Sequence, residues 1–496
     1  MKEPNHIIEK VFLEVNTSDI ETANSIKNNI NSFLLNELFP RLELLFDEYN
    51  IDETVVRFDS LNINLSVDNL ENLEHVKHEI YCELETRFKQ HIEHDITSGS
   101  INPSSEKHTP NRISLIKDLE TSFLFFIENG YLPWYAKEEY IIEFTKEKNW
   151  NLCLKDEDFE VRLAKLLKEK STAVERFILQ FQDKIILSFL KKTDASVSRN
   201  SAAITKIFKV LKDNLKLSFL RFLINVSLFN DKENWLPALK KIYLTISENE
   251  KQLNRFAGFA FVSEFKTVVR KIVLRKGVDD FTAFETELTA GNSVEPVITP
   301  ELTKENKQQL NILKDKTNEN EKELQFVEKE TIEIAVQNAG LILLHPFLKK
   351  FFIETGIADG EGLLIKEKSD LAIQTLHFLA TGNENVLESN LVLEKFLCNI
   401  PLKTPVFKQS LLTDEIRDES FTMLKTAIKH WPALKKTSPV GLQQMFINRD
   451  GKLIKKENGY KLIVERKAQD VLLEKLHWNI SIIKLPWKRD LLFVEW

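Results

Sequence analysis

Histidine and cysteine side chains gather in one predicted helix, which spans residues 70–95. His75, His78 and Cys82 are three and four positions apart, so a helix would place them on one face. Imidazole and thiolate groups are common zinc ligands. That face is otherwise charged, however, and His91 falls on the opposite, apolar side of the helix. We therefore interpret the three side chains as a solvated face, with a zinc site completed by a fourth ligand from elsewhere as the alternative.

Tryptophans are the second group of residues whose spacing suggests a site. Trp478, Trp487 and Trp496 are each nine residues apart, and Trp431 lies upstream of them. Aromatic platforms that stack bases usually carry basic or amide groups between their rings. Here most of the intervening apolar residues are isoleucine and leucine. These apolar neighbours predict that the tryptophans lie in a buried core or at a protein interface. We therefore expect the four tryptophans to lock the fold or to dock a partner.

Signatures of enzymes and cofactor sites are missing from the sequence. It contains no G-x-S-x-G, no H-E-x-x-H and no G-x-x-x-x-G-K-[ST]. The glycines of residues 356–362 do not follow a dinucleotide-binding pattern. No pair of carboxylates has a context that suggests acid–base catalysis. We therefore expect a protein that is not an enzyme, without catalytic residues and without a cofactor.

The overall composition is typical of a soluble globular protein. Hydrophobic residues make up 43% and charged residues 29% of the chain, and the formal net charge is −7. A negative balance gives no reason to expect a nucleic-acid partner. Three dispersed cysteines argue against a disulfide framework. The sequence has neither a signal-peptide pattern nor an apolar stretch of about 18 residues, so we expect a cytoplasmic protein that does not enter a membrane.

The apolar pattern predicts an α+β fold that is predominantly α-helical. Glycine (13) and proline (14) are scarce, which favours long helices over a turn-rich β fold. Residues 1–96 are typical of a β-α-β-α module, with strands at 6–15 and 54–67 and a helix after each. Residues 97–112 form a linker rich in serine and proline. Residues 113–288 are predicted to be all-helical, with Gly277 as a helix stop.

The carboxyl-terminal half is predicted to be a linker followed by a mixed module. Residues 289–330 are charged and nearly without aromatic residues, which is typical of a segment that does not pack alone. The last module, residues 331–496, is expected to begin with a helix from Thr331. Thr437 or Ser438 should cap a helix near Pro439. Asn458-Gly459 predicts a β-hairpin, and a short helix and two more strands complete a small terminal sheet.

Several ordered segments together resemble the tape measure protein family of contractile injection systems, the phage-tail-like particles of bacteria. The carboxyl-terminal segments are VQNAGLILLHPFL (336–348), LATG (379–382), LVLEKFLCNIPL (391–402), WPALKKTSPVGLQQMFINRDGKL (431–453), VERKAQDVLL (464–473) and LHWNISIIKLPWKRDLLFVEW (476–496). HIIEKVFLEV (6–15) and VRFDSLNINL (56–65) are similar to that family's opening. The two ends together cover roughly half of the chain. One departure is His477, where the pattern would place a proline.

The resemblance implies a non-enzymatic structural protein that acts in particle assembly. Such a protein would lie in the lumen of the growing inner tube and set the length of tube and sheath. The implied partners are the inner tube, the baseplate hub and the tube-terminating cap, together with self-association of several copies. The implied location is first the cytoplasm and then the assembled particle. The alternative is an assembly chaperone or baseplate adaptor that binds tube or hub components without measuring length.

Overall fold

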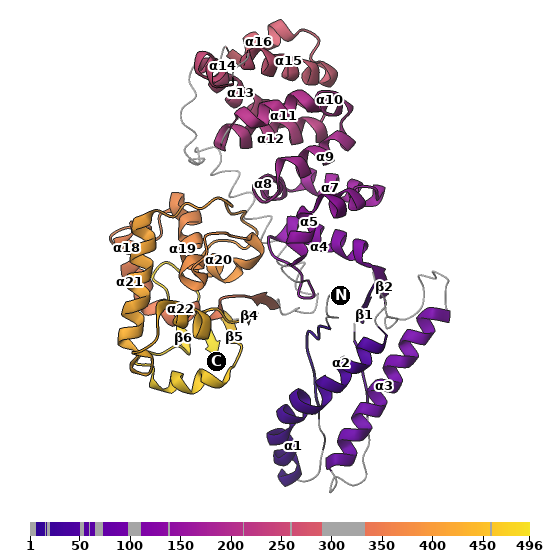
Figure 1. Cartoon of the computed structure of the whole chain (residues 1–496), viewed down its shortest axis with the longest axis vertical. Helices are drawn as coiled ribbons and strands as arrows, with labels where there is room; N and C mark the ends of the chain where they lie inside the picture. Colours follow the sequence, from indigo (N-terminus) through magenta and orange to yellow (C-terminus); the bar gives the residue numbers. More distant parts are fainter. Residues whose placement is uncertain are drawn as a thin grey trace, which may run out of the picture. The chain divides into compact units, whose positions relative to one another are not determined.

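The computed structural model describes residues 6–14, 16, 20–49, 54–58, 60–64, 73–97, 111–136, 139–211, 213–257, 260–289, 333–456 and 459–496. Helices dominate and the strands form two small sheets, which confirms the predominantly α-helical α+β fold (Figure 1). The chain divides into two compact units. The first comprises residues 1–123 and 133–156, and the second comprises residues 124–132 and 157–496.

The first unit begins with helices that share one core. Helix α1 (Ile20–Phe33) continues through a π-helical turn, η1 (Leu34–Leu38), into α2 (Phe39–Glu48). Pro40 lies in the first turn of α2 and has no N–H to bond the carbonyl four residues earlier, which accounts for the wider turn before it. Helix α3 (Leu73–Thr97) contributes Phe88 and Ile92 to the same core, and it confirms the predicted second helix.

The strands of the first unit differ from those predicted. Strand β1 (Thr54–Arg57) pairs antiparallel with β2 (Asn111–Ser114), and the described residues that follow Arg57 lie outside any strand. Residues 6–14 form no β-ladder in the described part of the chain, so the strand predicted there is not formed. Alternation of apolar and charged residues identifies two faces, but a strand also needs a neighbouring backbone to bond, and the pattern does not supply one.

Three further helices complete the first unit around a buried carboxylate. They are α5 (Glu139–Thr145), α6 (Glu147–Cys153) and α4 (Leu115–Asn129), whose residues from Leu124 onward belong to the second unit. The Phe123 ring lies 5.1 Å from the Phe144 ring and 5.2 Å from the Trp150 ring, between centroids. Asp118 of α4 is fully buried and accepts hydrogen bonds from Arg57 of β1 and from the hydroxyl of Tyr140 in α5. This carboxylate ties the two-stranded sheet to the helices.

Short helices in succession form the helical array, which we define as residues 157–289 of the second unit. They are α7 (Glu157–Glu169), α8 (Ser171–Gln180), α9 (Asp183–Thr193), α10 (Ala195–Arg199), α11 (Ser201–Val210), α12 (Asp213–Leu228), α13 (Lys232–Glu248), α14 (Glu250–Ala257), α15 (Phe261–Val273), η2 (Leu274–Lys276) and α16 (Phe281–Thr289). Phe177, Phe189, Phe219 and Trp235 are completely buried between these helices. Gly277 has a φ of +82° and ends η2, as the sequence predicted.

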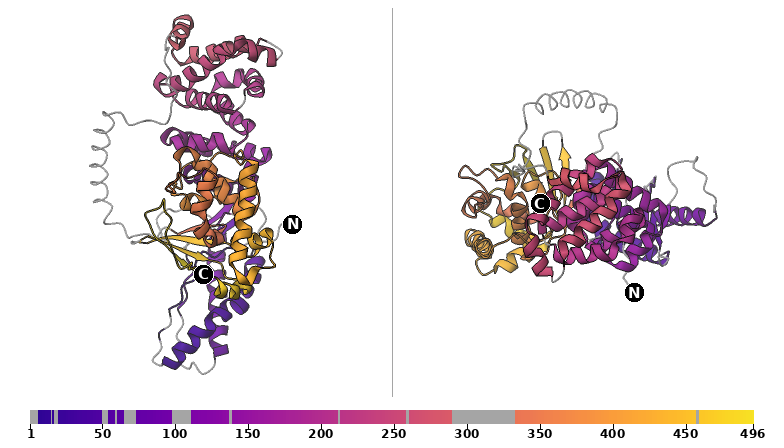
Figure 2. Two further views of the ribbon diagram at one scale, coloured as in Figure 1. Left: turned by 90° about the vertical axis from the view of Figure 1, so that its left-hand side faces the viewer. Right: turned by 90° about the horizontal axis from the view of Figure 1, so that it is seen from above.

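The C-terminal module, residues 333–496, also belongs to the second unit and combines helices with a five-stranded sheet. Its helical elements are η4 (Ala339–Leu344), α18 (His345–Glu354), η5 (Lys366–Lys368), α19 (Ser369–Thr381), η6 (Glu388–Asn390), α20 (Val392–Leu397), α21 (Asp414–His430), η7 (Pro432–Leu434), α22 (Pro439–Leu442), η8 (Gln443–Ile447) and η9 (Ala468–Lys475). Its strands are β3 (Glu333–Val336), β4 (Gly451–Lys456), β5 (Gly459–Val464), β6 (Ile482–Ile483) and β7 (Leu492–Glu495). Figure 2 shows the sheet lying to one side of these helices.

The sheet brings the two ends of the module together. The strand order is β3-β4-β5-β7-β6, and only the β5–β7 pair is parallel among the described strands. Strands β4 and β5 form the predicted hairpin, with Gly459 at a φ of +129°. Ser438 caps α22 by accepting the Gly441 N–H (3.0 Å), which also agrees with the sequence.

The helix predicted from Thr331 onward is wrong in its first turns. Residues 333–336 instead form β3, which pairs with β4 in antiparallel register, Ile334 opposite Leu453. Asn338 then takes a left-handed conformation (φ +56°), and η4 begins at Ala339. Isoleucine and valine at alternate positions favour a strand, and the neighbouring β4 backbone supplies its hydrogen-bonding partner.

Candidate functional site in the C-terminal module

Each of the four tryptophans singled out in the sequence donates its indole N–H within the C-terminal module. The pairs are Trp431 with the Leu472 carbonyl (3.0 Å), Trp478 with the Leu343 carbonyl (3.0 Å), Trp487 with the Leu397 carbonyl (2.7 Å) and Trp496 with Oδ2 of Asp470 (3.0 Å). A buried indole generally needs such an acceptor. Every ring is therefore fastened to a segment distant from it in the sequence.

The rings differ in how deeply they are buried. Trp431 is 1% exposed, and its ring centroid lies 4.8 Å from that of Phe446. Trp487 is 9% exposed and lies 5.3 Å from Phe352. Trp478 and Trp496 are half-buried and pack against the same core. The two interior rings suit a role in folding, whereas the two half-buried rings also keep a surface that a partner can touch.

Trp496 completes a polar network around a buried arginine. Arg449 is 1% exposed, and its guanidinium donates to the Glu465 carbonyl (3.0 Å) and to Oδ1 of Asp470 (2.9 Å). The other oxygen of Asp470 accepts the Trp496 indole N–H, and Arg466 donates to the Trp496 main-chain oxygen (2.9 Å). The Asp470 carboxylate of η9 thus links the last residue of the chain to Arg449, which in turn bonds the residue that follows β5.

A second constellation, the buried junction, joins the helical array to the C-terminal module within the second unit. We define it as Arg176 of α8, Glu388 of η6 and Lys395 of α20. Oε1 of Glu388 accepts hydrogen bonds from Arg176 Nε (3.0 Å) and from Lys395 Nζ (2.7 Å). Arg176 also donates to the carbonyls of Ile127 (2.5 Å) and Lys403 (2.6 Å). All three charged side chains are at most 1% exposed.

Arg176 and Lys395 share the single carboxylate of Glu388, and Asp370 of α19 adds a second negative charge near Lys395. Burial lowers the pKa of Lys395, although the attraction of Glu388 opposes that shift. Gly130 lies against the junction at a φ of +83°, and a Cβ atom there would come within 2.7 Å of both Arg176 Nη2 and Glu388 Oε1. The junction is therefore tightly enclosed. Sequence reasoning missed it, because charged residues this far apart show no spacing that marks them as neighbours.

The predicted histidine and cysteine face is only partly brought together. Cys82 Sγ lies 3.5 Å from His78 Nε2, whereas His75 Nδ1 lies 3.5 Å from Oε1 of Glu79 and its side chain is 59% exposed. Among the described residues, no group of three or more His, Cys, Asp or Glu side chains is arranged to hold a metal ion. The solvated face and the alternative zinc site both stay predictions.

Comparison with known protein families decides what kind of protein carries these features. The profile of the family described as contractile injection system tape measure protein matches residues 5–496. The chain belongs to this family. The resemblance seen in the ordered segments is thereby confirmed and extends over nearly the whole chain. No curated protein and no solved structure matches it.

Membership in the tape measure family makes the chain a component of contractile injection systems and places it among structural proteins. The described helices of this family member include none that is long and apolar enough to span a membrane.

Proposed function

We propose that this chain is a non-enzymatic structural protein that sets the length of the inner tube and sheath in a contractile injection system. The observation that carries the proposal is the match to the tape measure family over residues 5–496. Its partners are the inner tube, the baseplate hub and the tube-terminating cap, and several copies associate in one particle. The chain is made in the cytoplasm and takes its place in the tube lumen, without nucleic acid or membrane.

The proposal assigns anchoring to the folded ends and spacing to the middle. A length-setting protein must be able to span a long distance, and 496 residues would span about 740 Å as one helix. Folded into a single globule, the same chain would have a radius of gyration of about 23 Å. The buried core and sheet of the C-terminal module support a role as an anchor, because extension would expose them. The helical array and the charged residues 289–330 set the spacing.

In-frame changes in the charged segment test this assignment. We would delete residues 304–325 in one strain and duplicate them in another, since both changes avoid the described elements of the chain. The mean particle length, measured by electron microscopy, should fall or rise by about 33 Å if the segment is helical and by about 70 Å if it is extended. A scrambled segment of the same length and composition is the matched control and should leave particle length unchanged.

A third variant extends the test to the helical array. Deletion of residues 250–289 removes α14, α15 and α16 and should also shorten the particles. If all three variants assemble into particles of parental length, the chain does not measure length. Recovery of the chain in precursors but not in finished particles would instead support the assembly chaperone or adaptor.

A further inference from the structure

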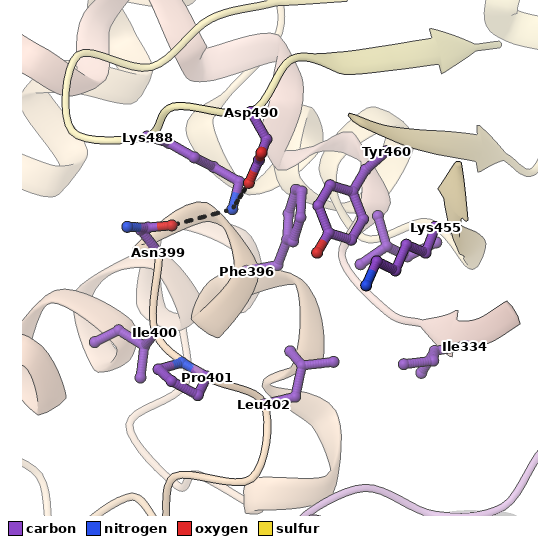
Figure 3. Close-up of a pocket in the computed structure, with 11 residues that line it drawn as sticks. Ile334, Phe396, Asn399, Ile400, Pro401, Leu402, Lys455, Tyr460, Lys488 and Asp490 are labelled. Carbon is purple, nitrogen blue, oxygen red and sulfur yellow. Dashed lines mark hydrogen bonds and ion pairs between the residues drawn. The ribbon is translucent and has the colours of Figure 1, made fainter. Parts of the chain in front are cut away.

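A hollow of about 360 Å³ lies between the five-stranded sheet and the loop that follows α20 (Figure 3). Ile334 of β3, Lys455 of β4 and Tyr460 of β5 line the sheet side, and residues 400–402 line the apolar opposite side. The loop is held in place because the Leu402 carbonyl accepts a hydrogen bond from Lys395 Nζ (3.0 Å). Ligand pockets in proteins start at about 300 Å³, so the hollow has room for one or two side chains of a partner.

Lys488 supplies a buried positive charge to this hollow. It is 7% exposed, and its Nζ lies 3.9 Å from the centre of the Phe396 ring. Among the described residues, the Nζ has one hydrogen-bond acceptor, Oδ1 of Asn399 at 3.3 Å. Oδ2 of Asp490, which also lines the hollow, forms a long ion pair with Lys488 at 3.9 Å, beyond hydrogen-bond distance, and the Asp490 side chain is 51% exposed. An ammonium group has three donors, so Lys488 keeps the capacity to bind another anion.

Two more polar groups complete the hollow. Figure 3 shows the Lys455 amine and the Tyr460 hydroxyl directed into the space above residues 400–402. Lys455 is exposed at the rim, and Tyr460 packs edge-on against Phe396 with ring centroids 4.7 Å apart. Positive charge and a hydroxyl over an apolar floor suit a ligand that carries a carboxylate beside an apolar group.

The sheet favours a peptide as that ligand. Strand β3 is the edge strand of the sheet as far as the described residues show, and its Ile334 lines the hollow. An edge strand can pair with an extended segment of another chain, whose alternate side chains then enter pockets beside the sheet.

We propose that this hollow binds an extended acidic segment of a partner protein. A carboxylate of the segment pairs with Lys488, and a neighbouring apolar side chain lies on residues 400–402. Lys455 adds attraction at the rim. This binding does not depend on whether the chain sets particle length.

Selection from a random peptide library tests the proposal. Random heptapeptides displayed on phage are selected on the immobilised full chain, and synthetic versions of the enriched sequences are measured by fluorescence polarisation. We expect enrichment of Asp or Glu next to Leu, Ile, Val or Phe. Lys488→Met and Lys455→Glu should each weaken binding at least tenfold. Lys456→Glu is the matched control, because it makes the same change of charge on the opposite face of β4 and should alter binding less than twofold.

Three outcomes would contradict the proposed binding site. No enrichment, enriched peptides without a carboxylate, or binding that is unchanged in both pocket variants would overturn the proposal. Thermal unfolding followed by circular dichroism checks that each variant folds. If Lys488→Met does not fold, binding by Lys455→Glu alone tests the proposal. The Lys455 side chain is exposed, so its replacement does not disturb the core.

Discussion

Arg176 and Glu388 form an ion pair across 212 positions of sequence, and both side chains are fully buried. Removing two charges from water costs about as much as their attraction returns, so the pair adds little net stability. Its consequence is specificity of packing. Any other placement of α8 on the C-terminal module would leave a buried charge without a partner, which is far more costly.

Glu388→Gln should therefore destabilise the second unit strongly. The substitution leaves Arg176 and Lys395 buried without their shared carboxylate, and breaking a buried pair in this way costs about 3–5 kcal/mol. Urea unfolding followed by tryptophan fluorescence would measure the loss. Glu169→Gln is the control, since its pair with Lys165 is on the surface (side chains 56% and 72% exposed) and should matter little. Equal midpoints for the two variants would contradict the role given to the junction.

Removal of residues 493–496 should destabilise the C-terminal module. It deletes most of β7, which pairs with both β5 and β6, and it removes the Trp496 indole from Asp470. We expect a lower melting temperature in the full chain, and a smaller decrease for Trp496→Phe, which keeps an aromatic ring but loses the hydrogen bond. A truncated chain that melts like the parent would show that Trp496 does not lock the fold and would leave docking as its role.

Gly340→Ala should be poorly tolerated. A Cβ atom at this position would lie 1.8 Å from the Phe446 carbonyl oxygen, so the backbone of η4 or η8 must move. Overpacking of this kind costs about 1–3 kcal/mol. Gly360→Ala is the matched control, because no atom lies within 4 Å of a Cβ built there. Comparable urea midpoints for the two alanine variants would show that η4 and η8 are not in this close contact.

Asp194 should stabilise the helical array in a pH-dependent way. Burial opposes ionisation of this carboxylate, but hydrogen bonds from Ser196 and the charge of Lys276 outweigh it and lower its pKa below the ordinary 3.8. A lowered pKa in the folded state means that the contribution is complete above pH 3.8 and is lost as the pH falls through the folded value. Asp194→Ala also removes the cap of α10 and should cost about 1 kcal/mol at pH 7.

Urea unfolding at pH 7 and pH 3 would measure this dependence. The difference in free energy of unfolding between the parent and Asp194→Ala should be smaller at pH 3 than at pH 7. Asp279→Ala removes an exposed carboxylate from the same array and serves as the control. If the difference in free energy of unfolding is the same at both pH values, the Asp194 carboxylate is not its cause.

The three cysteines of the folded chain should differ in how fast a thiol reagent modifies them. Cys153 and Cys398 are buried, and burial raises the pKa of Cys153 to about 12 and raises that of Cys398 as well. Only Cys82 should react quickly with a thiol reagent in the free protein. Mass spectrometry after labelling would identify the modified residues, and labelling in urea shows that all three can react. Rapid labelling of Cys398 in the free native chain would contradict the buried position.

Local features of this protein could be predicted from the sequence because each depends on a few consecutive residues. Three- and four-residue spacing of apolar side chains predicts the helices, Asn458-Gly459 predicts the β4–β5 hairpin, and Ser438 and Gly277 mark a helix start and a helix end. The ordered segments likewise carried the resemblance to the tape measure family, because a family pattern is a property of the sequence itself.

Contacts between segments that are distant in the sequence depend on the tertiary structure. Residues 333–336 are a strand because β4, more than 100 positions later, offers its backbone, while residues 6–14 form no β-ladder in the described part of the chain. The pairing of Arg176 with Glu388 and the closing of the hollow beside Lys488 also depend on packing. No regular spacing of residues in the sequence marks such contacts, because the free energy that selects them comes from the burial of many side chains at once.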